Sequence, residues 1–346
     1  MIDAHVHLDR AWTAEDKYWE HARISIREVR GWSLALKQRA VGKLHLGLAY
    51  AHDELYERMK AILEAKIVAG ENEVWACIDT SPDIKLVAFD CALKLRDEFA
   101  GQLDLKVGGY PIFGFKTFGS DRHELIKEAA KRAQFLVGLP ERDCAPEHTV
   151  GFDGHLQLLF EIAHENHLPV HIHVDQANDP RESGTEMLIE AVRWLGSPQV
   201  EGANGPTVWA VHVISPSAYD EERFNRLVDN LVKYNIGVIV CPHAALSMRQ
   251  LRPIVARTHN SIARVRELLA AEVPVRFGTD NIGDIFVDFK RPDLARELEL
   301  IGSAIRFYDE VIWGKIARGE PLDDVDLHTL QRSLEEDEEV FRTISL

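Results

Sequence analysis

Short apolar runs alternate along the chain with longer segments in which apolar residues recur every three or four positions. The short runs are almost continuously apolar, which is typical of strands in a parallel sheet whose two faces are both covered. Counting the first residues of the chain, they predict eight strands: 1–10, 73–80, 103–110, 134–140, 168–175, 207–214, 236–241 and 273–280. Eight strand–helix units predict an α/β fold, a (β/α)8 TIM barrel. A doubly wound open sheet is the alternative, but neither GxGxxG nor GxxxxGKS/T follows any strand.

The segments between the strands carry helix signals. Residues 43–70 have apolar side chains at helical spacing and end at Gly70, which suits the C′ position after a helix. The Ser-Pro pairs at 81–82 and 215–216 are predicted to open helices, because serine caps a helix and proline fits its first position. Further helices are predicted over 121–133, 154–166 and 186–195.

Two segments are additional to the eight predicted strand–helix units. Residues 10–42 are rich in Trp, Arg and Glu and too long for a plain connection. Such a segment after a barrel strand often closes over a ligand, and an extra helix packed on the rim is the alternative. The chain after Phe289 is predicted to be helical and ends in the acidic tract 335–339, interpreted as a solvated helix face. No linker or repeat divides the chain, so we expect one domain over 1–346 with a helical extension from about residue 290.

Composition narrows the classes of function. The 346 residues are 46% hydrophobic and 28% charged, which is ordinary for a globular protein with a large core. A net charge of −16 argues against nucleic acid as a partner, since a phosphate backbone requires a basic surface. The four cysteines are scattered without a CxxC pair and indicate neither a disulfide framework nor a thiolate zinc site. With no signal peptide before His5 and no membrane-length apolar run, we expect a cytoplasmic protein with a small-molecule substrate and no membrane partner; a homo-oligomer remains open.

Histidines gather at the predicted strand ends, where the chemistry of a (β/α)8 barrel is located. His5 and His7 are two apart, so both imidazoles point to the same face of the first strand. The neighbouring Asp9 and Arg10 are expected to pair and steady this strand, with a substrate role for Arg10 as the alternative. Later strands supply His171, His173, His212, His243 and Asp280. Three histidines and one aspartate leave a coordination position for water and suit a catalytic zinc or ferrous ion, which lowers the pKa of that water.

The motifs at these strand ends resemble those of the amidohydrolase superfamily, in particular its cytosine deaminase-like branch. The matching stretches follow the family's order: HVHLDR at 5–10, HVDQ at 173–176, VHVIS at 211–215, CPHAALSMR at 241–249 and FGTDNIGD at 277–284. The resemblance implies that one divalent metal ion, zinc or as the alternative iron, is bound by His5, His7, His173 and Asp280. It also implies that His212 polarises the group under attack or stabilises the developing oxyanion, and that Asp280 accepts the proton of the attacking water.

Departures from the family pattern bear on the chemistry. The deaminases carry HxxE on the fifth strand, and its glutamate shuttles a proton to the leaving group. This chain has Gln176 there, and an amide can orient a substrate but cannot deliver a proton at neutral pH. Two-metal members carry a carboxylated lysine at the end of the fourth strand, but 134–140 contains no lysine, so a mononuclear site is predicted. His171 lies deeper than His173 and is interpreted as a core residue, with an extra metal ligand as the alternative.

Other departures change the expected pocket. The third-strand motif that reads the pyrimidine edge, Phe-Pro-Gln-Glu-Gly in cytosine deaminases, is here YPIFG at 110–114, so Ile112 makes the pocket more apolar. The family's Asp-Asp pair after the eighth strand is here Asp280-Asn281, although Asp284 matches a further family aspartate. Together these changes argue against cytosine as the substrate. The residues predicted to bind the substrate are Tyr110, Ile112, Gln176, Asn281, Asp284 and His243, and Gln176 is also counted with Asp280 and His212 as a catalytic residue.

Three functions remain open from these residues. The leading hypothesis is a metal-dependent amidohydrolase that cleaves a C–N bond, in an amide or a ring-amino or alkylamino group, of a small substrate such as a heterocycle. The alternatives are an ester, lactone or phosphoester hydrolase on the same metal, and a non-catalytic small-molecule binding barrel. Family members usually add a small β-sandwich around the barrel. This chain starts at the first strand and shows no strand signals after Phe289, so we expect a barrel without that sandwich, unless the start codon has been placed late.

Overall fold

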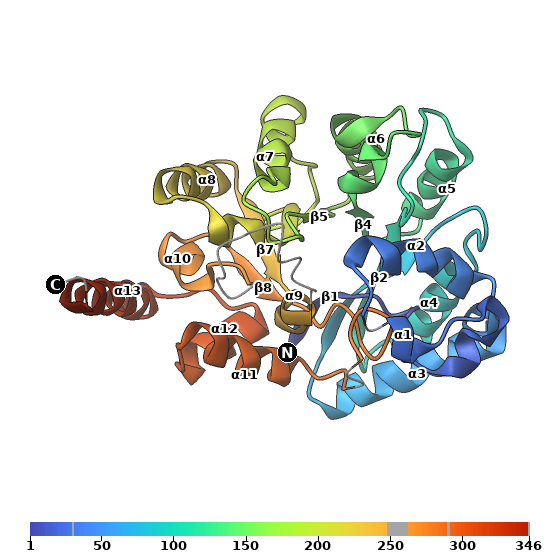
Figure 1. Cartoon of the computed structure of the whole chain (residues 1–346), viewed down its shortest axis with the longest axis horizontal. Helices are drawn as coiled ribbons and strands as arrows, with labels where there is room; N and C mark the ends of the chain where they lie inside the picture. Colours follow the sequence, from blue (N-terminus) through green and yellow to red (C-terminus); the bar gives the residue numbers. More distant parts are fainter. Residues whose placement is uncertain (30, 248–261, 289–290, 345–346) are drawn as a thin grey trace.

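The computed structural model describes residues 1–29, 31–247, 262–288 and 291–344. At its centre lies an eight-stranded sheet whose neighbouring strands are parallel and follow one another in chain order (Figure 1). The strands are β1 (Ile2–Val6), β2 (Glu73–Asp79), β3 (Asp104–Tyr110), β4 (Phe135–Gly138), β5 (Val170–Val174), β6 (Val208–His212), β7 (Ile236–Val240) and β8 (Val275–Phe277). The predicted (β/α)8 barrel is confirmed.

The barrel closes where the chain leaves β8 and meets β1. Asp280 N donates a hydrogen bond to His5 O, and His7 N donates one to Asp280 O, both at 2.8 Å. The pairing is parallel and runs past the end of each strand. Closure therefore places Asp280 beside the two histidines of β1.

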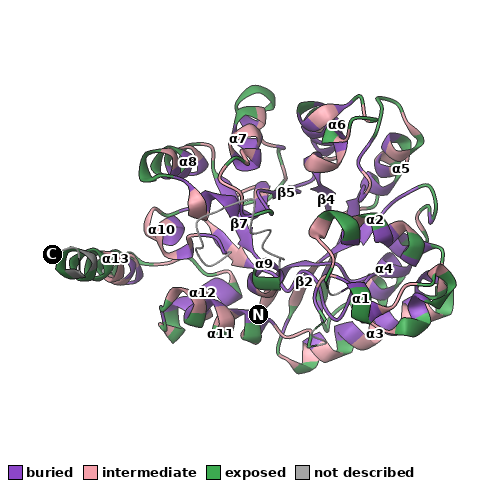
Figure 2. Cartoon of the chain, viewed as in Figure 1, coloured by how far each residue is buried: buried purple, intermediate pink, exposed green. Residues whose placement is uncertain are grey.

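Burial of the sheet on both faces explains its apolar runs. Every residue of β5 and of β7 is buried. Figure 2 shows the strands as buried, while exposed residues lie on the outer faces of the surrounding helices. Because neither face of the sheet meets solvent, the strands need no alternation of polar and apolar residues.

Helices surround the sheet (Figure 1). They are α1 (Ile26–Val29), α2 (Leu34–His45), α3 (His52–Val68), α4 (Val87–Glu98), α5 (Asp121–Ala130), α6 (Gly151–Asn166), α7 (Gly184–Leu195), α8 (Glu221–Lys233), α9 (Pro242–Ser247), α10 (Val265–Ala270), α11 (Leu294–Ile305), α12 (Glu310–Arg318) and α13 (Asp324–Ile344). Short 3-10 segments are η1 (Asp16–Tyr18), η2 (Glu20–Ala22), η3 (Leu48–Tyr50), η4 (Pro140–Cys144) and η5 (Ser215–Ala218). The predicted run 43–70 is divided by η3, so α3 starts only at His52. Its end is as predicted, with Gly70 at a φ of +85°.

The Ser-Pro pair at 81–82 does not open a helix, and the prediction there is wrong. Ser81 donates a side-chain hydrogen bond to Asp83, and Ser81 pairs across the turn with Lys85, which has a φ of +52°. This turn occupies the residues that would have formed the first helical turn, so α4 begins at Val87. The pair at 215–216 opens the 3-10 segment η5, as its proline allows.

The chain after β8 is helical in its described part. Trp313 of α12 packs edge-on against Phe277 of β8, with ring centroids 5.8 Å apart, which fixes this helix to the barrel. Helix α13 extends outward to the C-terminus (Figure 1), and its acidic tract 335–339 is exposed, as predicted. Within the described ranges all named strands belong to the barrel sheet, and no helix is long and apolar enough to cross a membrane.

Candidate active site

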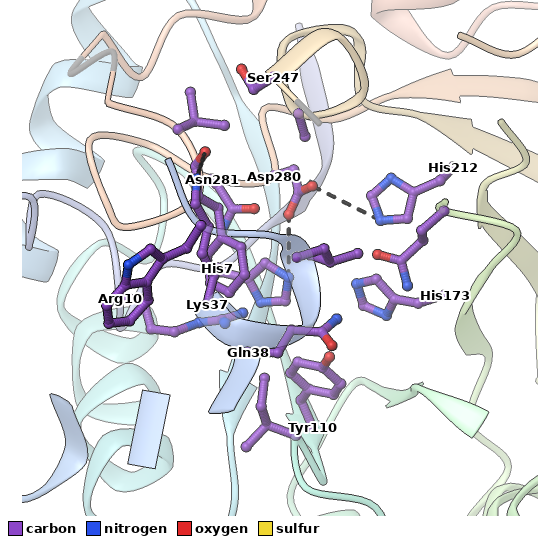
Figure 3. A pocket seen from close by; sticks show the side chains of 17 residues that line it. His7, Arg10, Lys37, Gln38, Tyr110, His173, His212, Ser247, Asp280 and Asn281 are labelled. Atoms are coloured by element: carbon purple, nitrogen blue, oxygen red, sulfur yellow. Dashed lines mark hydrogen bonds and ion pairs between the residues drawn. The ribbon is translucent and has the colours of Figure 1, made fainter. Parts of the chain in front are cut away.

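The carboxyl ends of four strands bring the predicted metal ligands together. His5 comes from β1, His173 from β5 and His212 from β6, while His7 directly follows β1 and Asp280 follows β8; all five are buried. His5 Nε2 lies 3.1 Å from His173 Nε2, and His7 Nε2 lies 3.2 Å from Asp280 Oδ1. His212 Nε2 lies 3.9 Å from the other carboxylate oxygen of Asp280 (Figure 3). Residues from four separate strands thus share one small volume.

The ligand atoms fall into two adjacent groups, His5, His7 and His173 in one and His212, Cys241 and Asp280 in the other, and two of the distances between them approach those around a tetrahedral ion. Four nitrogen or oxygen ligands about 2.0–2.2 Å from a zinc ion lie roughly 3.4 Å from one another. The His5–His173 nitrogen pair at 3.1 Å and the His7–Asp280 nitrogen–oxygen pair at 3.2 Å differ from that spacing by a few tenths of an ångström. The ligand atoms of His5, His7 and His173 all lie within 4.8 Å of one another. The donor set therefore suits a divalent ion such as zinc or iron.

The imidazoles have the protonation state that a metal requires. Burial lowers the pKa of His5, His7 and His212 well below the ordinary value, and that of His173 to about 4. All four are therefore neutral at pH 7. His173 Nδ1 lies 3.0 Å from Gly138 O, and donation of its proton to that carbonyl leaves the Nε2 lone pair facing His5. A backbone carbonyl of β4 thus selects the tautomer that can bind metal.

The surroundings of Asp280 disfavour the ionised form of its carboxyl group. Burial raises its pKa to about 8, Asp284 acts in the same direction, and the Arg10 guanidinium opposes them. A divalent ion beside the carboxylate favours its ionised form, which is the form that binds metal and accepts protons. Burial alone therefore favours the neutral acid, and a neighbouring cation would restore the carboxylate.

Unusual backbone conformations occur at three of the strand ends. Asp175, His212 and Asp280 have φ values of +56°, +81° and +54°. Non-glycine residues adopt this left-handed region rarely, and such strain clusters at functional sites. Asp175 O accepts hydrogen bonds from the backbone N–H groups of Ile214 and Ser215, which ties the loops after β5 and β6 together. The HVDQ and VHVIS motifs therefore share one strained junction beside the site.

Two thiols contact the histidine cluster. Cys77 Sγ of β2 lies 3.2 Å from His5 Nδ1, and Cys241 Sγ lies within 4.8 Å of the ligand atoms of His212 and Asp280. Burial raises the pKa of both thiols well above the ordinary value, so they are neutral rather than thiolate ligands. Their scattered positions along the chain carried no signal of this placement.

A cavity borders the histidine cluster (Figure 3). His7, His173, His212 and Asp280 line it, so the candidate ligands are reachable from it. Four of the predicted substrate-binding residues line it as well: Tyr110, Ile112, Gln176 and Asn281. The cavity therefore joins the candidate metal ligands to the positions at which this chain departs from the cytosine deaminase pattern.

Two predicted substrate-binding residues lie elsewhere. Asp284 accepts hydrogen bonds from Asn281 Nδ2 (2.7 Å) and from two backbone N–H groups after it, so it shapes the loop that carries Asn281. His243 lines a neighbouring cavity, and its Nδ1 lies 2.7 Å from Glu297 Oε1. Met248 and Arg249, at the end of the CPHAALSMR motif, lie outside the described residues.

The segment 10–42 contributes directly to the cavity. Trp32, Leu34, Lys37 and Gln38 line it, the last three from α2. Helix α2 therefore packs on the rim of the barrel and also supplies cavity wall, which combines the two expectations for this segment. The sequence signal was the excess length and aromatic content of the segment, but nothing in the pattern singled out Lys37 or Gln38.

Asp9 and Arg10 do not pair with each other, contrary to expectation. Asp9 accepts hydrogen bonds from Tyr50 Oη (2.7 Å) and from the backbone N–H of Asp79 (3.1 Å). Arg10 instead lies with Nε 3.5 Å from Asp79 Oδ2 and lines the cavity. The two side chains share a partner on β2 rather than contacting one another.

Comparison with known proteins places this geometry in context. No family model matches the chain. An uncharacterized protein of Haemophilus influenzae is 22% identical over 269 residues, which span 78% of this chain and 90% of that protein. A pterin deaminase of Rhizobium rhizogenes is 22% identical over 318 residues, which span 88% of this chain but only 64% of the deaminase.

Solved structures also resemble this chain. The 5-methylcytosine deaminase of Klebsiella pneumoniae, liganded with 5-fluorocytosine, superposes with a TM-score of 0.77 at 20% identity, over 91% of this chain and 72% of that one. The chain therefore has the fold of this deaminase. The fold implied by the strand-end motifs is thereby confirmed. The barrel places the candidate ligands at the carboxyl ends of its strands, where the motifs predict them.

Proposed function

We propose that this protein is a metal-dependent hydrolase that cleaves a C–N bond of a small heterocyclic substrate. The observation that carries the proposal is the convergence of His5, His7, His173 and Asp280, with His212 beside them, on the border of one cavity. Names of relatives agree with this chemistry: one is a pterin deaminase and another a 5-methylcytosine deaminase. Both names describe removal of an amino group from a heterocyclic ring.

One divalent ion, zinc with iron as the alternative, would be held by His5, His7, His173 and Asp280. When bound, such an ion supplies a nucleophile near neutral pH by lowering the pKa of water. The chemistry of the donor set supports a single ion, because β4 ends without the lysine that two-metal members use as a bridge. The neutral imidazoles and the Asp280 carboxyl together supply the ligand types that zinc and ferrous ions prefer.

Asp280 and His212 divide the proton chemistry. Asp280 Oδ2 faces His212 Nε2, and Oδ1 faces His7 Nε2, so one carboxylate oxygen is directed to the metal side and one toward His212. In this arrangement Asp280 accepts the proton of the attacking water. His212, which lines the cavity, holds a proton toward the negative charge that develops on the substrate.

Gln176 positions the substrate in this proposal. It lines the cavity between the histidine cluster and the rim, and its amide both donates and accepts hydrogen bonds. Because an amide cannot deliver the proton that a leaving amine needs, Asp280 must return the proton that it accepted. A Gln176→Glu variant tests this assignment: added deaminase activity on aminopyrimidines would show that the proton supply limits the native protein.

Gln176 also supports a second candidate function. A leaving oxygen needs less protonation than a leaving nitrogen, so Gln176 is also compatible with hydrolysis of esters, lactones or phosphoesters on the same ion. A non-catalytic binding barrel is the third. A panel of aminopterins, aminopyrimidines, amides, aryl esters and lactones separates the first two, and robust hydrolysis of any of them excludes the third.

The deciding experiment is elemental analysis of protein purified without chelators. We expect about one zinc or iron per chain, lost in His5→Ala and in Asp280→Ala. His52→Ala is the matched control, because that histidine is exposed on α3 and should leave the metal content unchanged. A content near two would contradict the mononuclear site, and a chain without metal would favour the binding barrel.

A further inference from the structure

Arg10 holds a buried charge on the wall of the cavity. Its side chain is 3% exposed, and it lines the same cavity as His7 and Asp280. The guanidinium carbon lies 5.9 Å from the ring centre of Tyr110 and 5.4 Å from that of Phe286. Contact with two aromatic rings restricts the guanidinium to a small range of orientations.

The guanidinium lacks hydrogen-bond acceptors. Within 1–29, 31–247, 262–288 and 291–344, its one charged partner at ion-pair distance is Asp79, at 3.5 Å from Nε, and Nε itself makes no hydrogen bond. No acceptor in those ranges contacts the terminal nitrogens. A buried cation without acceptors is costly, so such a group in a native cavity indicates a ligand that supplies them. Asp79 approaches the Nε side of the guanidinium, and Arg10 also lines the cavity, so the terminal nitrogens are the donors left for a ligand.

Asp79 holds Arg10 in place from behind. Its Oδ2 lies 3.1 Å from His45 Nε2, and its backbone N–H donates to Asp9. Asp79 is therefore anchored by two other elements, one of them α2, and its position does not depend on Arg10. A carboxylate fixed in this way orients the guanidinium before a ligand arrives, which reduces the entropy lost on binding.

Lys37 adds a second cation to the same wall. It is 8% exposed, lines the cavity, and its Nζ contacts Phe286 O at 3.4 Å. Among the residues that line the cavity Asp280 carries the one carboxylate, and that group is a candidate metal ligand. The cavity wall thus presents two cations that have no counter-ion of their own in the lining.

We propose that Arg10, assisted by Lys37, recognises a carboxylate group on the heterocyclic substrate. The inference rests on the proposed function, since it assigns the substrate class of that site. A carboxylate offers two coplanar oxygens, which match the paired donors of a guanidinium edge. Ile112 lines the same cavity and offers no polar group, and the neutral polar residues of the lining, such as Gln176 and Asn281, carry no charge to balance a carboxylate. Arg10 is a specificity-determining residue in this proposal.

Binding of a matched pair of probes tests the inference without requiring turnover. Benzoate and benzamide differ in charge and hardly in shape, and Trp32 in the cavity lining offers a fluorescence reporter beside calorimetry. We expect the metal-loaded protein to bind benzoate about 100-fold more tightly than benzamide, which corresponds to the cost of leaving a buried charge without its partner. Equal binding of the two probes would overturn the proposal and leave Arg10 hydrated by water only.

Coordination of benzoate by the metal itself has to be separated from binding by Arg10. The same titration on His173→Ala, which lacks a candidate ligand, makes that separation: preference for benzoate persists there if Arg10 carries it and disappears if the metal carries it. Loss of metal binding or of hydrolysis in the wild-type chain would refute the proposed function, but it would not change this comparison. The two failures are therefore distinguishable.

Variants assign the preference to residues. Arg10→Met should abolish the preference for benzoate, Arg10→Lys should retain part of it because the charge remains while the paired donors are lost, and Lys37→Met should reduce it by about tenfold. Arg332→Met, an exposed position on α13, is the control and should change nothing. If Arg10→Met does not fold because Asp79 keeps only His45 as a cationic partner, the double variant with Asp79→Asn removes the charges of Arg10 and Asp79 together. An unchanged preference in either folded form refutes the role of Arg10.

A turnover experiment then extends the inference to substrates. For aminopyrimidines with and without a ring carboxylate, Arg10→Met should lower kcat/KM of the carboxylated member about 100-fold and of the other less than about threefold. An equal loss for both members would indicate a merely structural role for Arg10 and would contradict the proposal.

Discussion

His171 and His173 stand two residues apart on the same strand and the same face, yet they belong to different regions of the barrel. His173 lies at the carboxyl end, with Nδ1 3.0 Å from Gly138 O and Nε2 3.1 Å from His5 Nε2. His171 lies nearer the amino end, stacked on Trp75 with centroids 5.2 Å apart and tilted against Phe135 at 4.6 Å. Both are buried, and burial lowers the pKa of His171 to about 3 and that of His173 to about 4.

The two regions differ in what they offer an imidazole. At the carboxyl end, Gly138 O accepts a hydrogen bond from Nδ1 of His173, and Nε2 of His173 faces the lone pair of His5 Nε2. The amino end supplies aromatic rings and a separate cavity of about 230 Å³ lined by residues from the starts of strands, with His171, Trp75 and Trp209 among them. His171 Nδ1 has no hydrogen-bond partner in the described structure. The two residues are of the same type, so the depth at which each lies along the barrel distinguishes the candidate ligand from the packing residue.

The largest expected effect comes from removing the candidate ligand. His173→Ala should abolish metal binding and lower activity at least about 10³-fold, more than the loss of a single oxyanion-hole donor. Metal content and kcat/KM of His173→Ala, compared with those of the control His52→Ala, provide the measurement. Retention of the metal by His173→Ala would remove the basis for the comparison between the two histidines.

His45 is a third buried histidine, and two neighbouring carboxylates raise its pKa instead of leaving it lowered by burial. Burial acts to lower the pKa of His45, but Asp79 and Asp83, at 3.1 and 2.9 Å from its ring nitrogens, raise it to about 9 from 6.5. The pKa of His45 is higher in the folded protein than in the unfolded chain, so protonation of His45 stabilises the folded state. This stabilisation is complete below pH 6.5 and is lost as the pH rises through about 9. It amounts to about 3 kcal/mol.

Unfolding free energies of the wild type and His45→Gln, measured from pH 6 to 9.5, test this. The difference between the two proteins should shrink as the pH rises, whereas a difference that stays constant across this range would show that His45 is neutral when folded. Taking the difference removes the contributions of other titrating groups that the two proteins share.

An intermediate effect is expected for the neighbour of His5. When His5 Nδ1 carries the proton, it donates a hydrogen bond to Cys77 Sγ at 3.2 Å. The Nε2 lone pair is then available to a metal. Cys77→Ala should therefore weaken metal affinity about tenfold, in the range found for partners of metal ligands. Competition with a chelator measures the affinity, and Cys91→Ala, a buried thiol on α4 away from the cluster, is the control. Equal affinities in the two variants would contradict a role for the thiol.

The smallest effect is expected at the amino end. His171→Leu replaces an imidazole that has an unsatisfied nitrogen with an apolar side chain of similar reach. We expect full metal content and a free energy of unfolding that changes by less than about 1 kcal/mol. Chemical denaturation and elemental analysis provide the measurement. Loss of the metal in this variant would make His171 a ligand after all and would erase the contrast with His173.

Much of the architecture was available from local patterns. Near-continuous apolar runs predicted the strands, because burial on both faces imposes that composition whatever the identity of the neighbours. The HxH of β1 and the later strand-end histidines predicted a metal site, since parallel strands deliver their carboxyl ends to the same side of a barrel. Gln176 and Ile112 could be recognised as departures because they fall within motifs whose order is kept.

Tertiary structure alone decided the rest, because it depends on contacts between distant segments. The partner of Arg10 is Asp79 on the neighbouring strand rather than the adjacent Asp9, and only barrel closure sets that choice. The same holds for Lys37, which enters the cavity because α2 crosses the rim, and for Cys77 beside His5. His171 and His173 show the principle most simply: the sequence places both imidazoles on one face, and the depth at which each meets the other strands determines which can bind a metal.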